Sequence, residues 1–419
     1  MDAHASFEFM KELIDKLHLK NVLKLSAATA VGQLITYGTA PILTRMYNAE
    51  DFAWFALFYA WVIPFAVLAT FRIEYSIPNA ETEMMARERA KLSINNAWRL
   101  ASGIALLFSV LYFFGFHISA FEAFLPIGIF SVAAIQTYNF LSTRLNRYRT
   151  NALYRVVNSL FINGTSIVLG YFLFDYLGLV IGFIVGQVIS MWVLFNGTRQ
   201  DELSEEPVKD ISLKNFKQYI FFNTPQGIIE TLQLSGTVWM LNVCFGDTTT
   251  GLYFMCWKII QAPVNLISNT VFLTHYNKAS ELKNTGESYR PLMLSTAKAL
   301  MAFSGIGAVI IVAFAPSLFA FVFGEEWRAS GEMARWLAPL FVLNFSVSPF
   351  SFTAILENAQ NKALGLNIID VILKLGALYL GFLMNSVMWA IGLYSLVSSI
   401  MYVITFLWYL QLAKPKLTH

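Results

Sequence analysis

Two lysines and two carboxylates stand inside long apolar stretches of this chain. Lys258 lies within LYFMCWKIIQAPVNL, at residues 252–266, and Lys374 follows Asp370 by four residues in a second apolar stretch; Glu230 lies in a third. A lysine near the bilayer centre costs about 2.5–3.5 kcal/mol on insertion scales. We therefore expect these side chains to face a protein interior or a water-filled cavity, where they could bind an anion and exchange a cation.

Two interpretations of these charges stay open. In the structural one, Asp370 and Lys374 form an intrahelical ion pair, because residues four apart share one helical face. Glu230 and Lys258 would then pair between neighbouring helices. In the functional one, the lysines line a polar cavity and hold an anionic substrate, while a carboxylate changes protonation. Ionisable residues within membrane spans favour the functional interpretation by default.

The composition predicts a membrane protein. Of 419 residues, 57% are hydrophobic and only 13% are charged, against about 25% charged in soluble domains. A net charge of +3 is too weak to indicate nucleic-acid binding. Metal-ligand spacings, phosphate-cradling glycine loops and nucleophile elbows are not found. We therefore predict a transporter rather than an enzyme, with no catalytic residue, cofactor or metal.

The chain contains stretches long and apolar enough to cross a membrane, each of about 20 residues. The first of them is rich in small and polar residues, which suit close helix packing or a cavity wall. The predicted spans are 22–46, 52–71, 97–117, 121–143, 153–174, 177–197, 217–244, 250–273, 293–323, 334–357, 363–384 and 387–410. The sequence therefore predicts an all-α polytopic membrane protein with about 12 transmembrane helices.

Basic residues set the predicted orientation. Nearly all of the 29 lysines and arginines fall in loops on one side of the predicted spans, and only Arg45, Arg328 and Arg335 fall on the other. Cytoplasmic loops carry an excess of basic residues. Both termini are therefore predicted to be cytoplasmic.

The spans divide into two sets of six around the most charged segment of the chain. GLVIGFIVGQVIS before this segment resembles MWAIGLYSLVSS after it, which favours two pseudo-symmetric six-helix lobes suited to alternating access. The predicted parts are an interfacial amphipathic helix (1–21), an N-lobe (22–197), a cytoplasmic linker (198–216), a C-lobe (217–410) and a cytoplasmic tail (411–419).

Residues 32–61 and 69–81 resemble the N-terminal region of Wzx-type flippases. These translocate O-antigen and capsule repeat units and belong to the multidrug/oligosaccharidyl-lipid/polysaccharide superfamily. Ala53 and Ile73 depart mildly from that pattern, which often has glycine and tyrosine there. The matching residues are Pro41 to Arg45, Tyr47, Asp51, Phe52, Ala56 to Phe58, Arg72 and Glu74.

The resemblance implies a substrate and a location. The substrate would be an undecaprenyl-diphosphate-linked oligosaccharide, moved from the cytoplasmic to the periplasmic leaflet of the bacterial inner membrane for O-antigen or capsule biosynthesis. Membrane lipids and the polysaccharide polymerase machinery would be its partners. A diphosphate headgroup agrees with the anion-binding cavity inferred from the residues.

Within that mechanism each charged residue has a predicted role. Basic residues draw the headgroup in at the cytoplasmic mouth, intramembrane lysines neutralise the diphosphate, and arginines mark the outer gate. The roles are Arg72 and Arg155 at the mouth, Lys258 and Lys374 on the diphosphate, Arg45 and Arg335 at the gate, and Glu230 and Asp370 as coupling residues or charge pairs. Coupling to H+, to Na+ or to the membrane potential alone stays open.

The sequence leaves two alternative functions open. A cation-coupled multidrug exporter of the same superfamily would need a net acidic cleft, and drug sensitivity of a deletion strain would reveal it. A membrane polymerase or ligase of lipid-linked sugars would need a sizeable outer-face loop. The longest predicted outer loop, GEEWRASGEMAR at 324–335, is short, which disfavours the polymerase.

Overall fold

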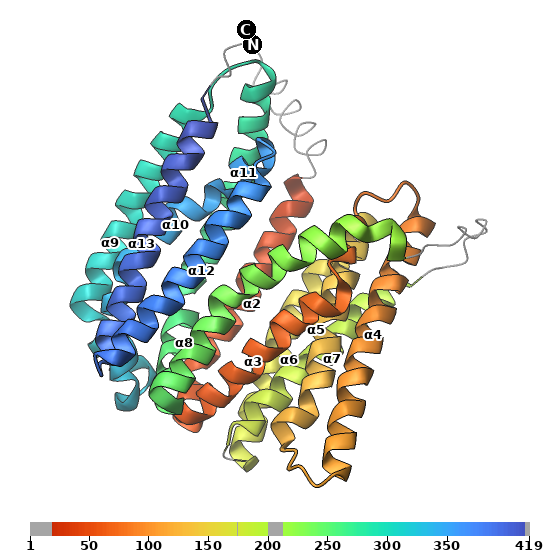
Figure 1. Cartoon of the computed structure of the whole chain (residues 1–419), viewed down its shortest axis with the longest axis vertical. Helices are drawn as coiled ribbons and strands as arrows, with labels where there is room; N and C mark the ends of the chain where they lie inside the picture. Colours follow the sequence, from red (N-terminus) through yellow and green to blue (C-terminus); the bar gives the residue numbers. More distant parts are fainter. Residues whose placement is uncertain (1–18, 174, 200–212, 415–419) are drawn as a thin grey trace, which may run out of the picture. The chain divides into compact units, whose positions relative to one another are not determined.

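A computed structural model describes residues 19–173, 175–199 and 213–414. The predicted interfacial helix over 1–21 and linker over 198–216 lie mostly outside the described residues. The described part is helical, with short 3-10 and π turns and no strand (Figure 1). Its α-helices are α2 (Leu19–Met46), α3 (Ala49–Thr70), α4 (Glu83–Phe113), α5 (Ala120–Arg144), α6 (Tyr148–Leu173), α7 (Leu177–Thr198), α8 (Thr224–Asn284), α9 (Arg290–Phe323), α10 (Arg328–Val347), α11 (Phe352–Leu356), α12 (Gln360–Leu383) and α13 (Val387–Leu412).

The prediction of about twelve spans in an all-α protein is confirmed. Within the described residues, 10 helices are long and apolar enough to cross a membrane. One of them, α8, contains two spans, because Gly246 breaks the helix with a left-handed φ of 79° that glycine adopts without steric cost. The 28-residue α2 adds the twelfth; its small and polar residues keep it below the hydropathy of the others.

The helices form two compact units, which we call unit 1 (residues 19–46 and 61–228) and unit 2 (residues 47–60 and 229–414). The first part of α3 thus packs within unit 2. Its Phe52 ring lies 5.1 Å from that of Trp327, edge to face. Gly251 of α8 lies so close to the carbonyl of Ala49 that any side chain there would clash.

Unit 1 is held together by small residues between α2, α6 and α7, which run side by side in Figure 1. Gly182 and Gly186 of α7 face Ser166 and Ile162 of α6 without room for a methyl group, and Gly32 of α2 likewise faces α6. Helices in lipid associate through such close backbone approach, because apolar side chains gain little by leaving acyl chains.

Unit 2 packs α9 and α12 against α10 and α13 in the same way. Gly331 of α10 abuts the backbone of α9 at Ala315, and Gly381 of α12 abuts Ala390 of α13. A buried hydrophobic cluster that contains several aromatic rings lies among residues of α8, α9, α11 and α13 and their flanking turns. Its members include Tyr289, Met293, Phe350, Phe352 and Tyr409.

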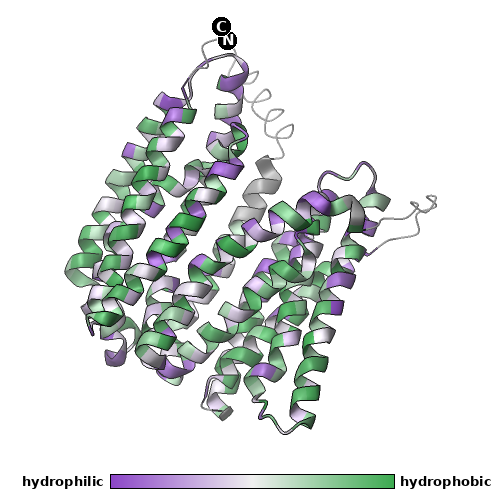
Figure 2. Cartoon of the chain, in the orientation of Figure 1, coloured by the Kyte–Doolittle hydropathy of each residue, from purple (hydrophilic) through white to green (hydrophobic). Residues whose placement is uncertain are grey.

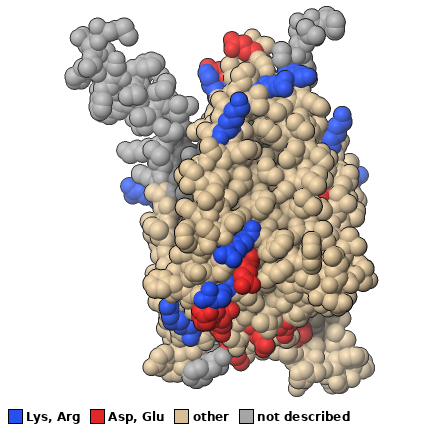
Figure 3. Space-filling model, turned by 90° about the vertical axis from the view of Figure 1, so that its left-hand side faces the viewer, with Lys and Arg blue, Asp and Glu red and all other residues tan. Residues whose placement is uncertain are grey.

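The surface of the described residues is that of a membrane protein. Hydrophobic residues run along the helices, while hydrophilic ones gather toward helix ends (Figure 2). On the face shown in Figure 3, most of the surface is uncharged, and the charged side chains gather in a few groups. The exposed leucine, phenylalanine and isoleucine side chains are therefore expected to contact acyl chains.

Candidate functional site

The strongest interaction predicted from the sequence, the pair on α12, is present. Lys374 Nζ donates to Asp370 Oδ2 over 2.6 Å, and the two residues are only 5% and 8% exposed. The ammonium also lies 5.9 Å and 5.8 Å from the ring centroids of Tyr394 and Tyr402 on α13, within the range of cation–π attraction. Among the described residues, Asp370 Oδ1 accepts no hydrogen bond. The pair therefore has one unused acceptor inside unit 2.

Lys258 differs from Lys374 in having no counter-charge. It is half-buried in the second part of α8, and no ion pair within 4.0 Å joins it to Glu230 or to any other side chain that the structure describes. The interhelical pair proposed in the structural interpretation is thus not formed, because Glu230 is exposed on the first part of α8. Lys258 remains an uncompensated cation within a span.

Aromatic rings connect the neighbourhood of Lys258 to the α12 pair. The adjacent Trp257 stacks on Tyr253 at 6.1 Å, and Tyr253 meets Tyr394 edge to face at 6.4 Å. Tyr394 is the ring beneath Lys374. The aromatic series thus runs from Trp257, the residue before Lys258 in the sequence, to the ring that Lys374 lies over.

Neutral polar side chains add to the interior of unit 2. Asn344 Nδ2 of α10 donates to Gln261 Oε1 of α8 over 3.2 Å, and the hydroxyls of Ser268 and Ser348 lie 3.0 Å apart. Amide and hydroxyl side chains of neighbouring membrane helices commonly form such hydrogen bonds. They require no ligand, so the unusual chemistry of unit 2 lies in the lysines and Asp370.

Arg72 and Arg155 lie in unit 1, and the guanidinium group of each lies over a tyrosine ring. Arg72 adopts a left-handed φ of 54° immediately after α3, donates to the Tyr75 hydroxyl and lies 4.8 Å from that ring. The Arg155 guanidinium lies 5.4 Å from the Tyr154 ring, and its buried Nε has no hydrogen-bond acceptor among the described residues. Arg155 therefore retains donors for a ligand.

Arg45 and Arg335, the predicted gate residues, are both exposed and bond to backbone carbonyls. Arg45 Nη1 donates to Pro41 O over 2.7 Å at the end of α2. In unit 2, Arg335 Nη2 of α10 donates to Ala313 O of α9 over 3.2 Å. Each guanidinium group thus donates one hydrogen bond to a backbone carbonyl, and its remaining N–H groups are available at the surface.

A buried carboxylate was missed as a site by the sequence analysis, although it lies in the motif that carries the family resemblance. Glu74, in the 3-10 turn Ile73–Ser76 that follows α3, is 0% exposed. Neither of its carboxylate oxygens accepts a well-formed hydrogen bond from the described residues. Burial raises the pKa of Glu74 above 4.5, and its backbone, the Thr70 hydroxyl and the Arg72 charge only partly oppose the rise.

A second unpredicted network lies in unit 2. Lys283 Nζ at the end of α8 is 3.2 Å from Glu357 Oε1, and the Tyr289 hydroxyl donates to the same oxygen over 3.2 Å. Burial, together with the nearby Glu357 carboxylate, raises the pKa of Tyr289. Sequence separation hid this network, because no local pattern relates a residue on α8 to one beyond α11.

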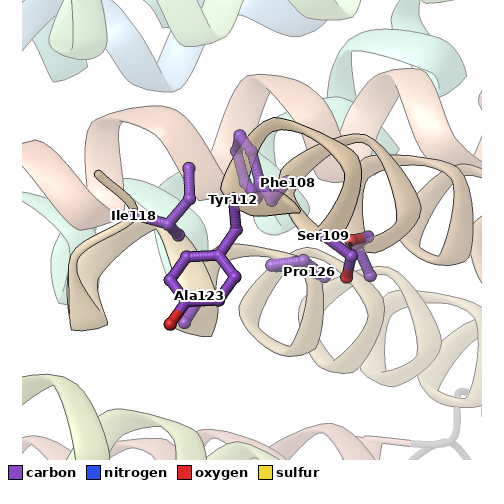
Figure 4. A pocket seen from close by; sticks show the side chains of 7 residues that line it. Phe108, Ser109, Tyr112, Ile118, Ala123 and Pro126 are labelled. Carbon is purple, nitrogen blue, oxygen red and sulfur yellow. Dashed lines mark hydrogen bonds between the residues drawn. The ribbon is translucent and has the colours of Figure 1, made fainter. Parts of the chain in front are cut away.

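A cavity in unit 1 holds none of the predicted site residues. It has a volume of about 410 Å³ and lies between the ends of α4 and α5 (Figure 4). Apart from Ser109 and the Tyr112 hydroxyl, the side chains around it are apolar. Its lining comprises Ala105, Phe108, Ser109, Tyr112, Ile118, Ala123 and Pro126. No group of three metal-ligating side chains occurs anywhere among the described residues.

The fold is similar to that of several solved transporter structures. It matches a multidrug resistance MATE family transporter of the MOP superfamily in an inward-facing conformation, with a TM-score of 0.63 at 16% identity over 94% of this chain and 95% of that one. An outward-facing structure of such a transporter matches with a TM-score of 0.60 at 17% identity, over 95% and 97%. A MOP superfamily transporter from Pyrococcus furiosus Vc1 matches with 0.57 at 16%, over 95% and 97%. The chain therefore has the two-lobed fold of these membrane transporters.

The family follows from the sequence. Residues 18–274 match the family model for polysaccharide biosynthesis proteins, and the chain belongs to that family. No curated protein sequence matches it. The family match spans α2 to α8, so it includes the Arg72 and Glu74 turn as well as Lys258.

Proposed function

We propose that this protein is a flippase that carries an undecaprenyl-diphosphate-linked oligosaccharide from the cytoplasmic to the periplasmic leaflet by alternating access. The observation that carries the proposal is a transporter fold in a polysaccharide biosynthesis family. A transporter in that biosynthesis must move either a precursor or a product. A lipid-linked repeat unit is the precursor whose apolar tail can stay in the bilayer during transfer. The membrane would be the bacterial inner membrane, and the repeat unit would serve O-antigen or capsule assembly.

The uncompensated Lys258 supports an anionic substrate. An unpaired cation inside a span is costly, and a diphosphate would supply the missing counter-charge while it passes. Arg155, whose Nε has no acceptor among the described residues, suits the earlier encounter with phosphate oxygens, since guanidinium groups bind phosphate in a forked geometry. Arg72 is the second guanidinium that we assign to this encounter. Arg45 and Arg335 would meet the headgroup at the outer end.

The Asp370–Lys374 pair offers a way to couple transport to a cation. If Lys374 turns to a phosphate oxygen, Asp370 loses its counter-charge and needs another cation, either H+ or Na+. An inside-negative membrane potential would act in the same direction, because moving one elementary charge across 100 mV is worth about 2.3 kcal/mol. Glu230, exposed on α8, is the second carboxylate that could take part.

The decisive experiment is deletion of the gene in its host. We expect lipid-linked repeat units to accumulate on the cytoplasmic leaflet, where they stay protected from a glycan-modifying enzyme added outside intact spheroplasts. Surface polysaccharide should fall at least tenfold and return on complementation. Normal surface polysaccharide in the deletion strain would refute the proposal.

Lys258→Ala tests the charge directly. Loss of one neutralising contact to a phosphate costs about 1.5–3 kcal/mol, so we expect export to fall between tenfold and a hundredfold at unchanged protein level in the membrane. Lys258→Arg should retain part of the activity. Lys298→Ala, which removes an exposed lysine from α9, is the matched control and should export normally.

The multidrug alternative draws on the MATE transporters that share the fold. At 16–17% identity this likeness concerns the fold alone. A drug exporter should leave its deletion strain sensitive to cationic drugs while surface polysaccharide stays normal. We expect the reverse.

A further inference from the structure

A second basic site lies in unit 1, apart from all residues that the proposed transport mechanism uses. It is a cavity of about 300 Å³ among α4, α5 and α7. Arg87 and Lys91 of α4 and Arg199 at the end of α7 supply three positive charges to its wall. Tyr138 and Phe195 form an aromatic wall, with their rings 5.8 Å apart, edge to face. The cavity thus combines cations with an apolar surface.

The cations are only partly used by the protein itself. Arg87 donates through Nη1 to the carbonyl of Thr198, but its buried Nε has no acceptor among the residues described. Lys91 Nζ lies 3.8 Å from Glu88, beyond hydrogen-bonding distance and with both side chains exposed, so this contact is worth little. Arg199 makes no ion pair with any described side chain. The cavity wall therefore carries an excess of positive charge.

The surroundings indicate that the cavity borders lipid. Phe195 in its wall is 44% exposed, and Trp192, one turn earlier on α7, is 63% exposed. Large apolar side chains are exposed in this way where a helix faces acyl chains, and tryptophan prefers the headgroup level. By the distribution of basic residues, these helix ends belong to the cytoplasmic leaflet, whose anionic lipids attract lysine and arginine.

We propose that this cavity binds the phosphate headgroup of an anionic glycerophospholipid, phosphatidylglycerol or cardiolipin, from the cytoplasmic leaflet. The phosphate takes the forked donors of Arg87 and Arg199 and the charge of Lys91. The glycerol backbone and the first acyl carbons lie along Tyr138, Leu141 and Phe195. Basic pockets between membrane helices on the cytoplasmic side are suited to such headgroups. The bound lipid joins the ends of α4 and α7, which the Arg87–Thr198 bond already connects.

The test compares purified full-length protein in detergent with added phosphatidylglycerol, phosphatidylcholine or glycerol phosphate. We expect phosphatidylglycerol to raise the thermal unfolding midpoint by several degrees, and the other two additives to have little effect. In native mass spectra, phosphatidylglycerol should stay bound through detergent removal. Protection by glycerol phosphate equal to that by phosphatidylglycerol would overturn the proposal, because a free phosphate would then suffice.

The variant K91Q/R199Q removes two cations while leaving Arg87 to hold α7, so its folding should be preserved. Each cation near an anionic lipid surface is worth about fivefold in binding, or about 1 kcal/mol. We therefore expect about 25-fold weaker retention of phosphatidylglycerol. The matched control R149Q/K298Q removes the same charge types from exposed positions on α6 and α9 and should bind the lipid normally.

Three outcomes would contradict the lipid site. If the control R149Q/K298Q lost as much lipid binding as K91Q/R199Q, the net charge of the protein would explain the loss, and a specific site would not be needed. If K91Q/R199Q lost the same amount of stability in phosphatidylglycerol and in phosphatidylcholine, the cations would bind a segment of the chain itself, such as the acidic run DELSEE at 201–206. Unchanged lipid retention with lost export would assign the cavity to the transported substrate. Transport failure from other causes does not alter lipid retention, so the two proposals fail separately.

Discussion

Glu74 of unit 1 and Asp370 of unit 2 are both buried carboxylates, but their surroundings are opposite. Asp370 of unit 2 lies in the middle of α12 and is neutralised by Lys374 at 2.6 Å. Glu74 of unit 1 lies in the turn after α3 and has no well-formed hydrogen bond to either oxygen among the described residues. A buried ion pair is stable only while both partners remain, whereas a lone buried acid is stable when protonated. The comparison sets a buried carboxylate with a counter-charge against a buried carboxylate without one.

The largest effect is expected from breaking the pair of unit 2. Asp370→Ala leaves Lys374 as an unpaired buried charge, which should cost about 3–5 kcal/mol of folding free energy. Thermal unfolding in detergent and the yield of folded protein would measure it. The double variant D370L/K374M should recover most of the stability, because apolar replacement of both partners is often neutral.

The same variants sharpen the functional question. If D370L/K374M is stable but does not export polysaccharide, the pair is needed for transport as well as for structure. If it exports normally, the coupling role proposed for Asp370 and Lys374 is wrong. If Asp370→Ala unfolds at the wild-type temperature, the pair contributes no stability and the contrast with Glu74 disappears.

The sequence predicted local pairs and missed distant ones, for a physical reason. The pair of Asp370 and Lys374 could be predicted from the sequence, because helical geometry alone places residues four apart on one face. The predicted pair of Glu230 and Lys258 does not form. Whether side chains on two different spans meet depends on how those spans pack and rotate, and in the structure Glu230 is exposed. The weak first span was found because its small residues signalled close packing, and α2 indeed packs on α6 at Gly32.

Contacts between residues far apart in the sequence could not be predicted, because they depend on how the helices pack. Hydropathy shows that α3 is apolar, but it cannot show that the first part of the helix packs in unit 2. The motif around Glu74 was recognised by resemblance. Its complete burial depends on side chains from several helices, and no spacing rule predicts that.

A smaller effect is expected for the network at the end of α8 in unit 2. Glu357→Ala removes the acceptor of the Tyr289 hydroxyl and the counter-charge of Lys283. The cost should be no more than about 2 kcal/mol, because Lys283 is partly exposed and keeps its bond to the Leu356 carbonyl. Differential scanning fluorimetry would measure the loss. Glu281→Ala is the matched control, because its pair with Lys278 is exposed. Equal effects of the two variants would show that burial does not matter here.

Glu74→Gln should change stability in the opposite direction. The pKa of Glu74 is raised above 4.5, so the folded state binds the proton more tightly than the unfolded state does. Its contribution is then fully present below pH 4.5 and is lost as the pH rises through the raised pKa. At pH 7 the glutamine variant should be more stable by about 1 kcal/mol, on the scale of a buried unpaired polar group.

The pH dependence provides the check on this prediction. Wild-type stability should fall between pH 4.5 and neutrality more steeply than that of Glu74→Gln, and the two curves should meet at the acidic end. Parallel curves would mean that Glu74 keeps its ordinary pKa and is solvated. In that event Glu74 would be an unremarkable surface acid, and unit 1 would contain no titrating counterpart to the pair of unit 2.

The smallest effect on folding is expected at the exposed ends, where both units carry one arginine. Arg45→Ala and Arg335→Ala each remove a guanidinium that bonds to a carbonyl at the surface, so stability should change by no more than about 0.5 kcal/mol. Export is a separate measurement, because the proposed gate role predicts a several-fold loss in each variant at normal protein level. Lysine at either position should retain most of the export, since charge rather than forked geometry would suffice to attract the headgroup. Normal export in both alanine variants would confine the functional charges to the interior of unit 2 and the mouth residues of unit 1.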